Sequence, residues 1–206
     1  LIIFNSKQRQ KVYMIQQEAI EEMLSGKNVF LTGEPGAGKT YTLNEFIRRA
    51  QAQDKRIAIT ASTGIAASHL GGTTIHSWSG LGIADQIHDA DLDRMSYKPQ
   101  IRERYNRCDI LIIDEVSMLH GSRLDMVDRA CRWVRNNEKP FGGLQVIFVG
   151  DMFQLPPVTR GSDETDFAHK SNAWRVAELT PCYLTEQHRQ GADDKLLNIL
   201  REMRNG

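Results

Sequence analysis

One stretch of this 206-residue sequence, VFLTGEPGAGKT at residues 29–40, indicates the class of fold. Val29 to Leu31 form a short apolar run that is typical of a buried strand. Glycine and proline crowd residues 33–38, which predicts a loop, and apolar residues then recur at helical spacing from Leu43 to Ala50. A buried strand, a loop and an amphipathic helix in this order form the unit from which parallel sheets are built.

The same alternation continues on both sides of this stretch. We expect further strands at Arg56 to Ala61, Ile110 to Ile113 and Leu144 to Val149, and further helices at Ile15 to Leu24, Leu124 to Val134 and Leu196 to Met203. Because helices separate the short apolar strands, we predict an α/β fold with a central parallel β-sheet and helices on both faces. Residues 83–107 show little apolar pattern, so we expect a surface excursion with some helix there.

Length and composition bound the number and kind of domains. A chain of 206 residues that is 40% hydrophobic and 25% charged fits one globular domain, residues 1–206, and excludes disordered and collagen-like proteins. Its longest apolar runs are far shorter than the roughly 20 residues that cross a bilayer, so we expect no membrane span and no membrane partner. The first residue is not Met and no signal-peptide pattern follows it, so we expect a piece of a longer protein.

Charge and cysteine content bound the partners and the compartment. The 26 basic residues balance 26 acidic ones, whereas proteins that coat DNA usually carry a basic surface. Neutrality on average still permits a modest basic region. The three cysteines are widely spaced and form no C-x-x-C pair, which disfavours a disulfide framework. We therefore expect a reducing intracellular compartment, namely the bacterial cytoplasm, or the nucleus or mitochondrion of a eukaryote.

The loop after the first strand fits the phosphate-binding pattern G-x-x-x-x-G-K-[ST]. Its glycines let backbone N–H groups turn toward phosphates, and the start of the following helix adds positive potential. Lys39 is expected to reach the terminal phosphates and the Thr40 hydroxyl to bind Mg²⁺. The predicted cofactors are therefore a nucleoside triphosphate and Mg²⁺, and the family resemblance given below implies that the triphosphate is ATP. The expected cofactor contacts in this region are Gly33, Pro35, Gly36, Ala37, Gly38, Lys39, Thr40 and Tyr41.

Two carboxylates, Asp114 and Glu115, follow the apolar strand at Ile110 to Ile113. Ligands of open parallel sheets bind at the carboxyl ends of the strands. Asp114 is expected to hold Mg²⁺, and Glu115 is expected to orient or deprotonate the attacking water. Together with the phosphate loop, this pair predicts an enzyme that hydrolyses a nucleoside triphosphate.

Further motifs follow in a fixed order: TASTGIAA at 60–67, TIHSW at 74–78, DEVSM at 114–118, PFGG at 140–143 and GDMFQLPPV at 150–158. With the phosphate loop, they resemble the motifs of the PIF (petite integration frequency) family of superfamily-1B DNA helicases, from about Gln16 to Gly206. The resemblance implies the N-terminal RecA-like domain, called 1A, of a P-loop ATPase. Such a domain couples ATP hydrolysis to 5′-to-3′ translocation on single-stranded DNA.

The resemblance also assigns residues to the nucleic acid. Single-stranded DNA is expected at Ser62, Thr63, Gly64, Thr74, His76 and Pro156. The first three follow a strand and begin a helix, where hydroxyls and backbone N–H groups suit a phosphate. Thr74 and His76 add polar groups, whereas Trp78 fits base stacking and core packing equally well.

Three further residues are expected at the nucleotide. By resemblance, Gln154 and Arg189 sense the γ-phosphate and Gln16 reads adenine, although the adjacent Gln17 fits that role too. His188 departs from the aromatic residue that the family usually has beside the arginine. Asp151 either supports its loop or is an exposed turn carboxylate.

The resemblance places the ATP site between two RecA-like domains, and a second one does not fit in 206 residues. We therefore expect a monomer whose partner domain lies elsewhere in the same parent chain, and an isolated domain that binds nucleotide weakly and does not unwind DNA. Two alternatives remain: a non-helicase ATPase of the AAA type, and a DNA-binding module that ATP regulates.

Overall fold

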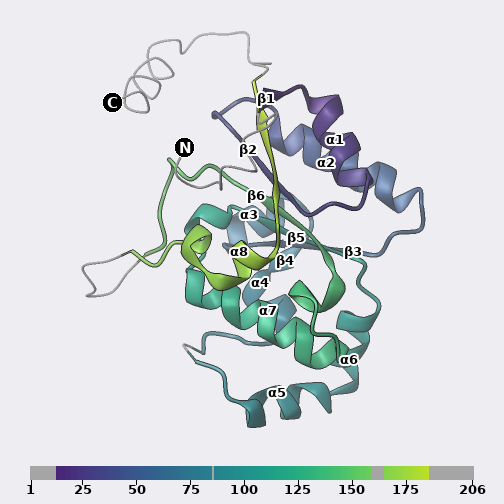
Figure 1. The fold of residues 1–206 in the computed structure, drawn as a ribbon, viewed down its shortest axis with the longest axis vertical. Coiled ribbons are helices and arrows are strands. Elements are labelled where there is room, and N and C mark those ends of the chain that lie inside the picture. Colours follow the sequence, from purple (N-terminus) through teal and green to yellow (C-terminus); the bar gives the residue numbers. More distant parts are fainter. Residues whose placement is uncertain (1–12, 85, 159–164, 186–206) are drawn as a thin grey trace.

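The computed structural model describes residues 13–84, 86–158 and 165–185. Within them, seven parallel strands form one sheet in the order β1-β7-β2-β6-β5-β3-β4 (Figure 1). The strands are β1 (Tyr13–Met14), β2 (Val29–Gly33), β3 (Ile57–Ala61), β4 (Thr73–Thr74), β5 (Ile110–Asp114), β6 (Gln145–Val149) and β7 (Thr180–Leu184). The helices are α1 (Gln16–Leu24), α2 (Lys39–Gln51), α3 (Gly64–His69), α4 (Ile75–Ser79), α5 (Asp89–Ser96), α6 (Pro99–Asn106), α7 (Gly121–Arg135) and α8 (Asn172–Val176).

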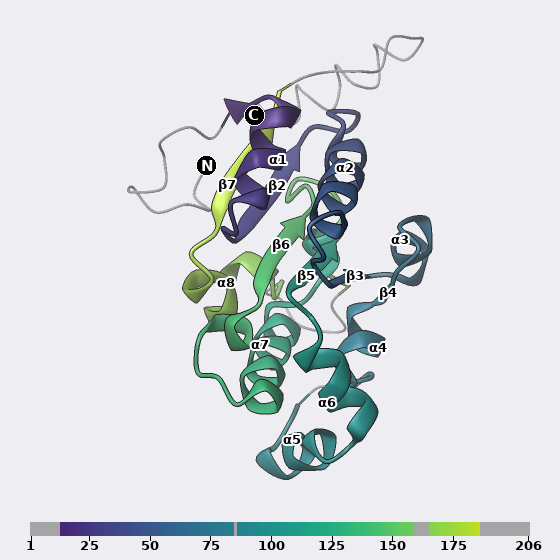
Figure 2. The same ribbon diagram turned by 90° about the vertical axis from the view of Figure 1, so that its right-hand side faces the viewer.

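Helices cover both faces of the sheet, as the sequence predicts (Figure 2). Successive residues of a strand point to opposite faces, so the central strands divide their side chains between two cores. Leu31 and Ile112 pack on the side of α1 and α2, whereas Phe30 and Leu111 pack on the side of α7. Among the described helices, none has both the length and the apolar character needed to span a membrane.

The four expected strands are confirmed as β2, β3, β5 and β6, whereas β1, β4 and β7 have no clear sequence signal. The strand β7 contains Pro181, which normally argues against a central strand. The register explains why it is tolerated. Thr180 faces β2, so Pro181 directs its missing N–H toward β1, which reaches only Tyr183 and Leu184.

Residues 83–107 are more closely packed than their sequence suggests. They form α5 and α6 at one end of the molecule, which agrees with the expected helical content (Figure 1). The segment is not confined to the surface, because one side of each helix enters the core beside α7. The buried residues of this segment are Ile87, Leu92, Met95, Ile101 and Tyr105. Charged residues between these positions dilute the helical periodicity in the sequence.

The PFGG motif is a packed turn between α7 and β6. The backbone N–H of Phe141 donates to Asp128 Oδ1 at 2.6 Å, and Arg135 Nε donates to the Gly142 oxygen at 2.8 Å. A Cβ atom on Gly142, which has a φ of +62°, would lie 2.5 Å from the Cys131 oxygen. This motif therefore fixes the entry into β6 and has a structural role.

The three cysteines are buried free thiols. Burial raises the pKa of Cys108 to about 11 and that of Cys182 to about 12, and raises the pKa of Cys131 as well. A thiol with a raised pKa carries little thiolate at neutral pH, so these side chains are unreactive packing residues.

Candidate functional site

The predicted motifs meet at the carboxyl edge of the sheet. The register places Leu31 opposite Val149 and Asp114 opposite Ala61, so β2, β6, β5 and β3 end together. Two backbone hydrogen bonds join the loops that follow: Gly150 N donates to Leu31 O at 3.2 Å, and Ser62 N donates to Asp114 O at 3.0 Å. This edge is where open parallel sheets bind their ligands.

The phosphate loop depends on its glycines. Gly36 and Gly38 have φ angles of +85° and +84°, a conformation that other residues adopt only with strain. A Cβ on Gly33 would lie 2.9 Å from the backbone oxygen of Leu184 on β7. The helix α2 begins directly after Gly38 with no side-chain cap, so its first backbone N–H groups are directed toward the loop.

Lys39 folds back over the same loop. Its Nζ atom donates to the backbone oxygens of Gly33 at 2.8 Å and Glu34 at 3.1 Å. These bonds hold the ammonium group above the loop, close enough to Asp114 to oppose the rise that burial causes in the pKa of that carboxyl. The loop therefore combines positive potential from a helix start with one positioned cation.

The two carboxylates occupy different environments. Burial, reinforced by the nearby Glu115 carboxylate, raises the pKa of Asp114 to about 6, although Lys39 and a hydrogen bond from Glu115 N at 2.8 Å oppose the rise. Glu115 has a φ of +51°, in the left-handed region, at a cost of roughly 1 kcal/mol for a residue other than glycine. This conformation ends the strand and turns the chain sharply. Strain of this kind is typical of functional sites.

The loop after β6 is organised by Asp151. Its carboxylate accepts hydrogen bonds from Phe153 N at 3.1 Å and from Gln154 Nε2 at 3.0 Å, and the residue is only 2% exposed. The interpretation of Asp151 as an exposed turn carboxylate was therefore wrong, and its alternative, support of the loop, is confirmed. Gln154 is exposed, with its amide nitrogen fixed by this bond, and Pro156 is exposed two residues later.

The expected DNA residues after β3 make intramolecular bonds with their hydroxyls. Ser62 Oγ donates to the Glu115 backbone oxygen at 2.7 Å, and Thr63 Oγ1 accepts from Ala66 N at 3.3 Å as the N-cap of α3. Gly64 is exposed at the first position of that helix, so its backbone N–H faces solvent. The hydroxyls thus shape this corner, while the backbone offers the donor for a phosphate.

The motif at residues 74–78 forms the next corner. Thr74 caps α4 by accepting from Ser77 N at 3.2 Å. His76 is half-buried, and burial together with nearby Arg123 and His120 lowers its pKa. Trp78 is only 5% exposed and its ring centroid lies 4.7 Å from that of Tyr105, so its core interpretation holds.

The adenine candidates are distinguished by their hydrogen bonds. Gln17 Nε2 donates to Glu21 at 2.8 Å and its Oε1 accepts from Arg49 at 3.2 Å, so both ends of its amide have partners. Gln16, the first residue of α1, has no side-chain hydrogen bond within the described residues, which favours it over Gln17. Tyr41 is 65% exposed on the first turn of α2. Arg189 and the helix expected at 196–203 lie outside the described residues.

A comparison with known proteins now bears on this arrangement. A family model described as PIF1-like helicase matches residues 3–205. The chain belongs to the PIF1-like helicase family. The family resemblance in the motifs is thereby confirmed.

Curated relatives agree with this family. The chain is 50% identical over 199 residues to the ATP-dependent DNA helicase Pif1 of Psychrobacter sp. (strain PRwf-1), and 37% identical over 191 residues to the ATP-dependent DNA helicase PIF1 of Homo sapiens. Both alignments cover 93% of this chain but only 30% and 29% of those relatives. The chain therefore spans about a third of the length of the relatives it matches.

Solved structures agree on the fold. The Pif1 helicase of Candida albicans superposes with a TM-score of 0.84 at 34% identity, covering 92% of this chain and 43% of that one. The Pif1 helicase of Bacteroides in complex with ADP-AlF3 and single-stranded DNA gives a TM-score of 0.76 at 33% identity, covering 93% and 47%. The predicted RecA-like α/β fold is confirmed.

Proposed function

We propose that this chain is the 1A motor domain of an ATP-dependent DNA helicase, which couples hydrolysis of Mg-ATP to 5′-to-3′ translocation on single-stranded DNA. One observation carries the proposal: the 2.7 Å hydrogen bond from Ser62 Oγ to the Glu115 oxygen. It joins the expected DNA corner to the turn that holds the expected catalytic base. The names of the Psychrobacter and human relatives, and the Bacteroides complex with ADP-AlF3 and single-stranded DNA, support the same function.

The phosphate loop fits a nucleoside triphosphate. Its left-handed glycines and the uncapped start of α2 provide backbone donors in a concave loop. Lys39 would exchange its two carbonyl contacts for oxygens of the terminal phosphates. Gln16 would read the adenine through its side-chain amide, since the amide of Gln17 already has hydrogen-bond partners at both ends.

Thr40 and Asp114 fit Mg²⁺, which prefers hard oxygen ligands and keeps several waters. Thr40 lies on the first turn of α2, and the half-buried Asp114 carboxylate lies near Lys39 at the same edge. When bound, the ion neutralises charge on the phosphates. A divalent cation also stabilises the ionised form of Asp114 against the effect of burial.

Glu115 would act on the attacking water. Its left-handed backbone turns the chain beyond the buried strand, beside the phosphate loop and the loop after β6. A carboxylate there orients the water and accepts its proton. Gln154, fixed by Asp151, would sense the γ-phosphate. Arg189 remains a prediction for the same role, because a guanidinium matches the spread charge of the transferring group.

The DNA would lie over the corners formed by Ser62–Gly64, Thr74–His76 and Pro156. The backbone N–H of Gly64 offers a phosphate donor without side-chain competition. His76 has a lowered pKa, so its imidazole is neutral at pH 7 and contacts DNA by hydrogen bonding and packing. Few positive charges are involved, which suits a motor that must release phosphates at each step and agrees with the zero net charge.

We further propose that a second RecA-like domain of the same polypeptide completes the ATP site and half of the DNA groove. The 206 residues alone would then bind nucleotide weakly and fail to unwind DNA. We expect a monomeric protein in a reducing compartment, the bacterial cytoplasm or a eukaryotic nucleus or mitochondrion, because its thiols are free and buried.

The deciding experiment is ATP hydrolysis by the longer parent protein with single-stranded DNA, with RNA and without nucleic acid. We expect single-stranded DNA to raise the turnover number. Equal turnover in all three conditions would favour the AAA-type alternative. DNA binding that responds to ATP without any single-turnover hydrolysis would favour the regulated DNA-binding module.

A further inference from the structure

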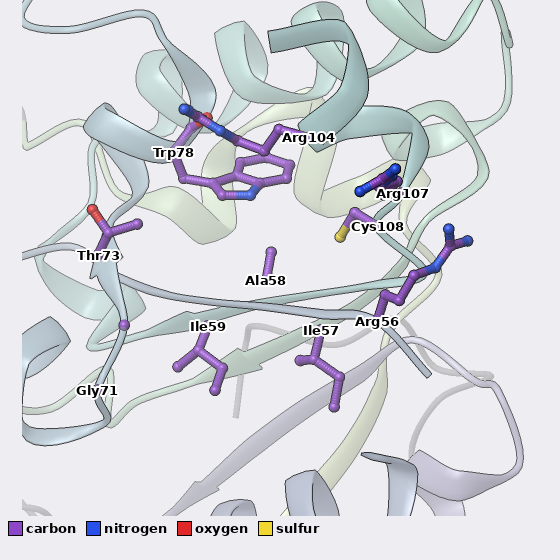
Figure 3. Close-up of a pocket in the computed structure, with 11 residues that line it drawn as sticks. Arg56, Ile57, Ala58, Ile59, Gly71, Thr73, Trp78, Arg104, Arg107 and Cys108 are labelled. Atoms are coloured by element: carbon purple, nitrogen blue, oxygen red, sulfur yellow. The ribbon is translucent and has the colours of Figure 1, made fainter. Parts of the chain in front are cut away.

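A slot of about 510 Å³ lies beside β3; its lining includes Trp78, the last residue of the TIHSW motif, but no residue of the phosphate loop (Figure 3). The strand forms its floor, with Ala58 directed into the slot, and Trp78 and Arg104 lie above. Arg56 and Arg107 lie together at one end. This end is where β3 begins, whereas the expected DNA corner follows the opposite end of the strand.

Beside the slot, part of one edge of β3 has no neighbouring strand to share backbone hydrogen bonds with. Along its whole length β3 pairs with β5, but β4 pairs only with Thr60 and Ala61. In a parallel pair, alternate residues direct both backbone groups to the same neighbour. The backbone oxygen of Arg56 accepts from the start of β5, so the backbone groups of Ala58 face β5 as well. The backbone groups of Ile57 and Ile59 therefore face the slot, although their side chains point away from it (Figure 3). Within the described residues, the N–H groups of Ile57 and Ile59 and the oxygen of Ile57 therefore have no strand partner.

Two glycines lie where the chain enters β4. Gly71 has a φ of +64°, in the left-handed region, two residues before β4 begins. Gly72 approaches β3 so closely that a Cβ would lie 2.2 Å from the Ile59 oxygen. The chain thus reaches β3 beside the Ile59 oxygen and pairs only with the end of the strand, which leaves the edge before that oxygen without a neighbouring strand.

Three arginines line the slot, of which Arg56 is paired with Asp109 at 2.9 Å. Arg104 donates to the backbone oxygens of Ser77 at 3.1 Å and Trp78 at 2.7 Å, which fixes the guanidinium without a carboxylate partner among the described residues. Arg107 pairs with Glu103 at 2.9 Å, but both side chains are more than half exposed, so this pair exchanges readily with another anion. An incoming segment therefore meets cationic side chains as well as unpaired backbone groups.

We propose that this slot binds an extended acidic segment of a partner protein, which adds a strand to the open edge of β3. Backbone hydrogen bonds to Ile57 and Ile59 would supply affinity, and the arginines would select acidic side chains. The edge of three residues spans about 10 Å, which suits a short linear motif. A nucleic acid fits less well, because Trp78 is 5% exposed and packs against Tyr105, so it offers no open face for base stacking.

The test measures fluorescence anisotropy of a labelled peptide, acetyl-Glu-Val-Asp-Val-Glu-amide, titrated with the 206-residue chain. We expect saturable binding that weakens with salt, and no saturable binding of the matched lysine peptide. Ile57→Pro removes one edge donor at the first residue of the strand, where proline is tolerated, and is expected to weaken binding about tenfold. Arg107→Glu is expected to weaken it about fivefold, whereas Arg102→Glu, on the helix α6 that ends just before Arg107, should have no effect.

Thermal unfolding of each variant checks that the fold is intact, and amide NMR shifts give a second readout. Peptide-induced shifts at Ile57 and Ile59 that exceed those at Ile112 in the neighbouring strand would support strand addition. The proposal is wrong if the peptide does not bind, if the lysine peptide binds equally well, or if Ile57→Pro and Arg107→Glu both bind like the parent chain. Displacement of the peptide by oligothymidylate, with matching shifts at Ile57, would assign the slot to nucleic acid instead.

Discussion

The phosphate loop and the loops expected to bind DNA share one edge of the sheet but are held in different ways. Lys39 is fixed by carbonyls five and six residues before it. The bond from Ser62 to Glu115, in contrast, joins residues 53 positions apart. The nucleotide loop is therefore encoded locally, whereas its link to the DNA corner exists only once β3 and β5 are aligned.

This difference predicts that substitutions in the two regions will impair ATP hydrolysis in two different ways. Changes in the local loop should remove ATP hydrolysis itself, with or without DNA. Changes in the long-range contacts should leave basal hydrolysis and reduce the response to DNA. The following predictions test that separation in the longer parent protein, beginning with the largest effect.

Replacing Lys39 by alanine should lower ATP turnover about 100-fold or more, because the positioned cation at the terminal phosphates is lost. Steady-state hydrolysis with and without single-stranded DNA measures the effect, and both values should fall. Lys55→Ala, which removes an exposed lysine beyond the end of α2, is the matched control and should behave as the wild type. Unchanged turnover in Lys39→Ala would contradict the assignment of the phosphate loop.

Glu115→Gln should lower the rate of hydrolysis about 100-fold while nucleotide affinity stays within about twofold, since the amide keeps the size of the side chain but cannot accept the proton. Single-turnover hydrolysis and nucleotide titration measure the two quantities separately. Glu138→Gln, at an exposed position, serves as the control. A loss of affinity as large as the loss of rate would assign Glu115 to binding instead.

Asp151→Ala should lower the free energy of unfolding by about 1–3 kcal/mol, because the N–H of Phe153 loses its buried acceptor and Gln154 loses its anchor. Stimulation by DNA should fall more than basal hydrolysis. Asp151→Asn retains one acceptor oxygen and should lose less stability. If chemical denaturation finds alanine and asparagine equal to the wild type, the loop does not depend on this carboxylate.

Thr63→Ala should have the smallest effect, a loss of about 1 kcal/mol in unfolding free energy, because α3 loses its N-cap. Thr63→Ser keeps the capping oxygen and should restore most of that stability. Basal hydrolysis should stay the same in both variants. A large fall in basal hydrolysis would mean that this hydroxyl acts at the nucleotide rather than at the helix.

Local patterns explain which parts of the fold were predictable. The strands β2, β5 and β6 are continuous apolar runs, and the phosphate loop is a continuous motif, so each can be recognised without knowledge of its neighbours. Strands β1 and β4 have two residues each, too few to show a period. The strand β7 was hidden by Pro181, whose tolerance depends on where β1 stops.

The residue types of the candidate site could be predicted from the sequence, whereas its hydrogen bonds could be predicted less well. Asp151 precedes two N–H groups that its carboxylate can bind, which is a local turn signal, but its burial depends on tertiary packing. The hydroxyl of Ser62, which the sequence predicts at a DNA phosphate, donates to Glu115, because register brings the two loops together; its role toward DNA stays a prediction. Ser117 lies in the DEVSM motif, but nothing in the sequence indicates that its hydroxyl is buried with no hydrogen-bond partner within the described residues.

The most direct test of the central claim is the ratio of ATP turnover with and without single-stranded DNA in Ser62→Ala of the parent protein. The account predicts unchanged basal turnover and a ratio reduced about fivefold, the equivalent of one lost hydrogen bond. Ser68→Ala, at an exposed position on the helix α3 that follows Ser62, should keep the wild-type ratio. A wild-type ratio in Ser62→Ala, or an equal fall in both turnover values, would contradict the claim that this bond links the two regions.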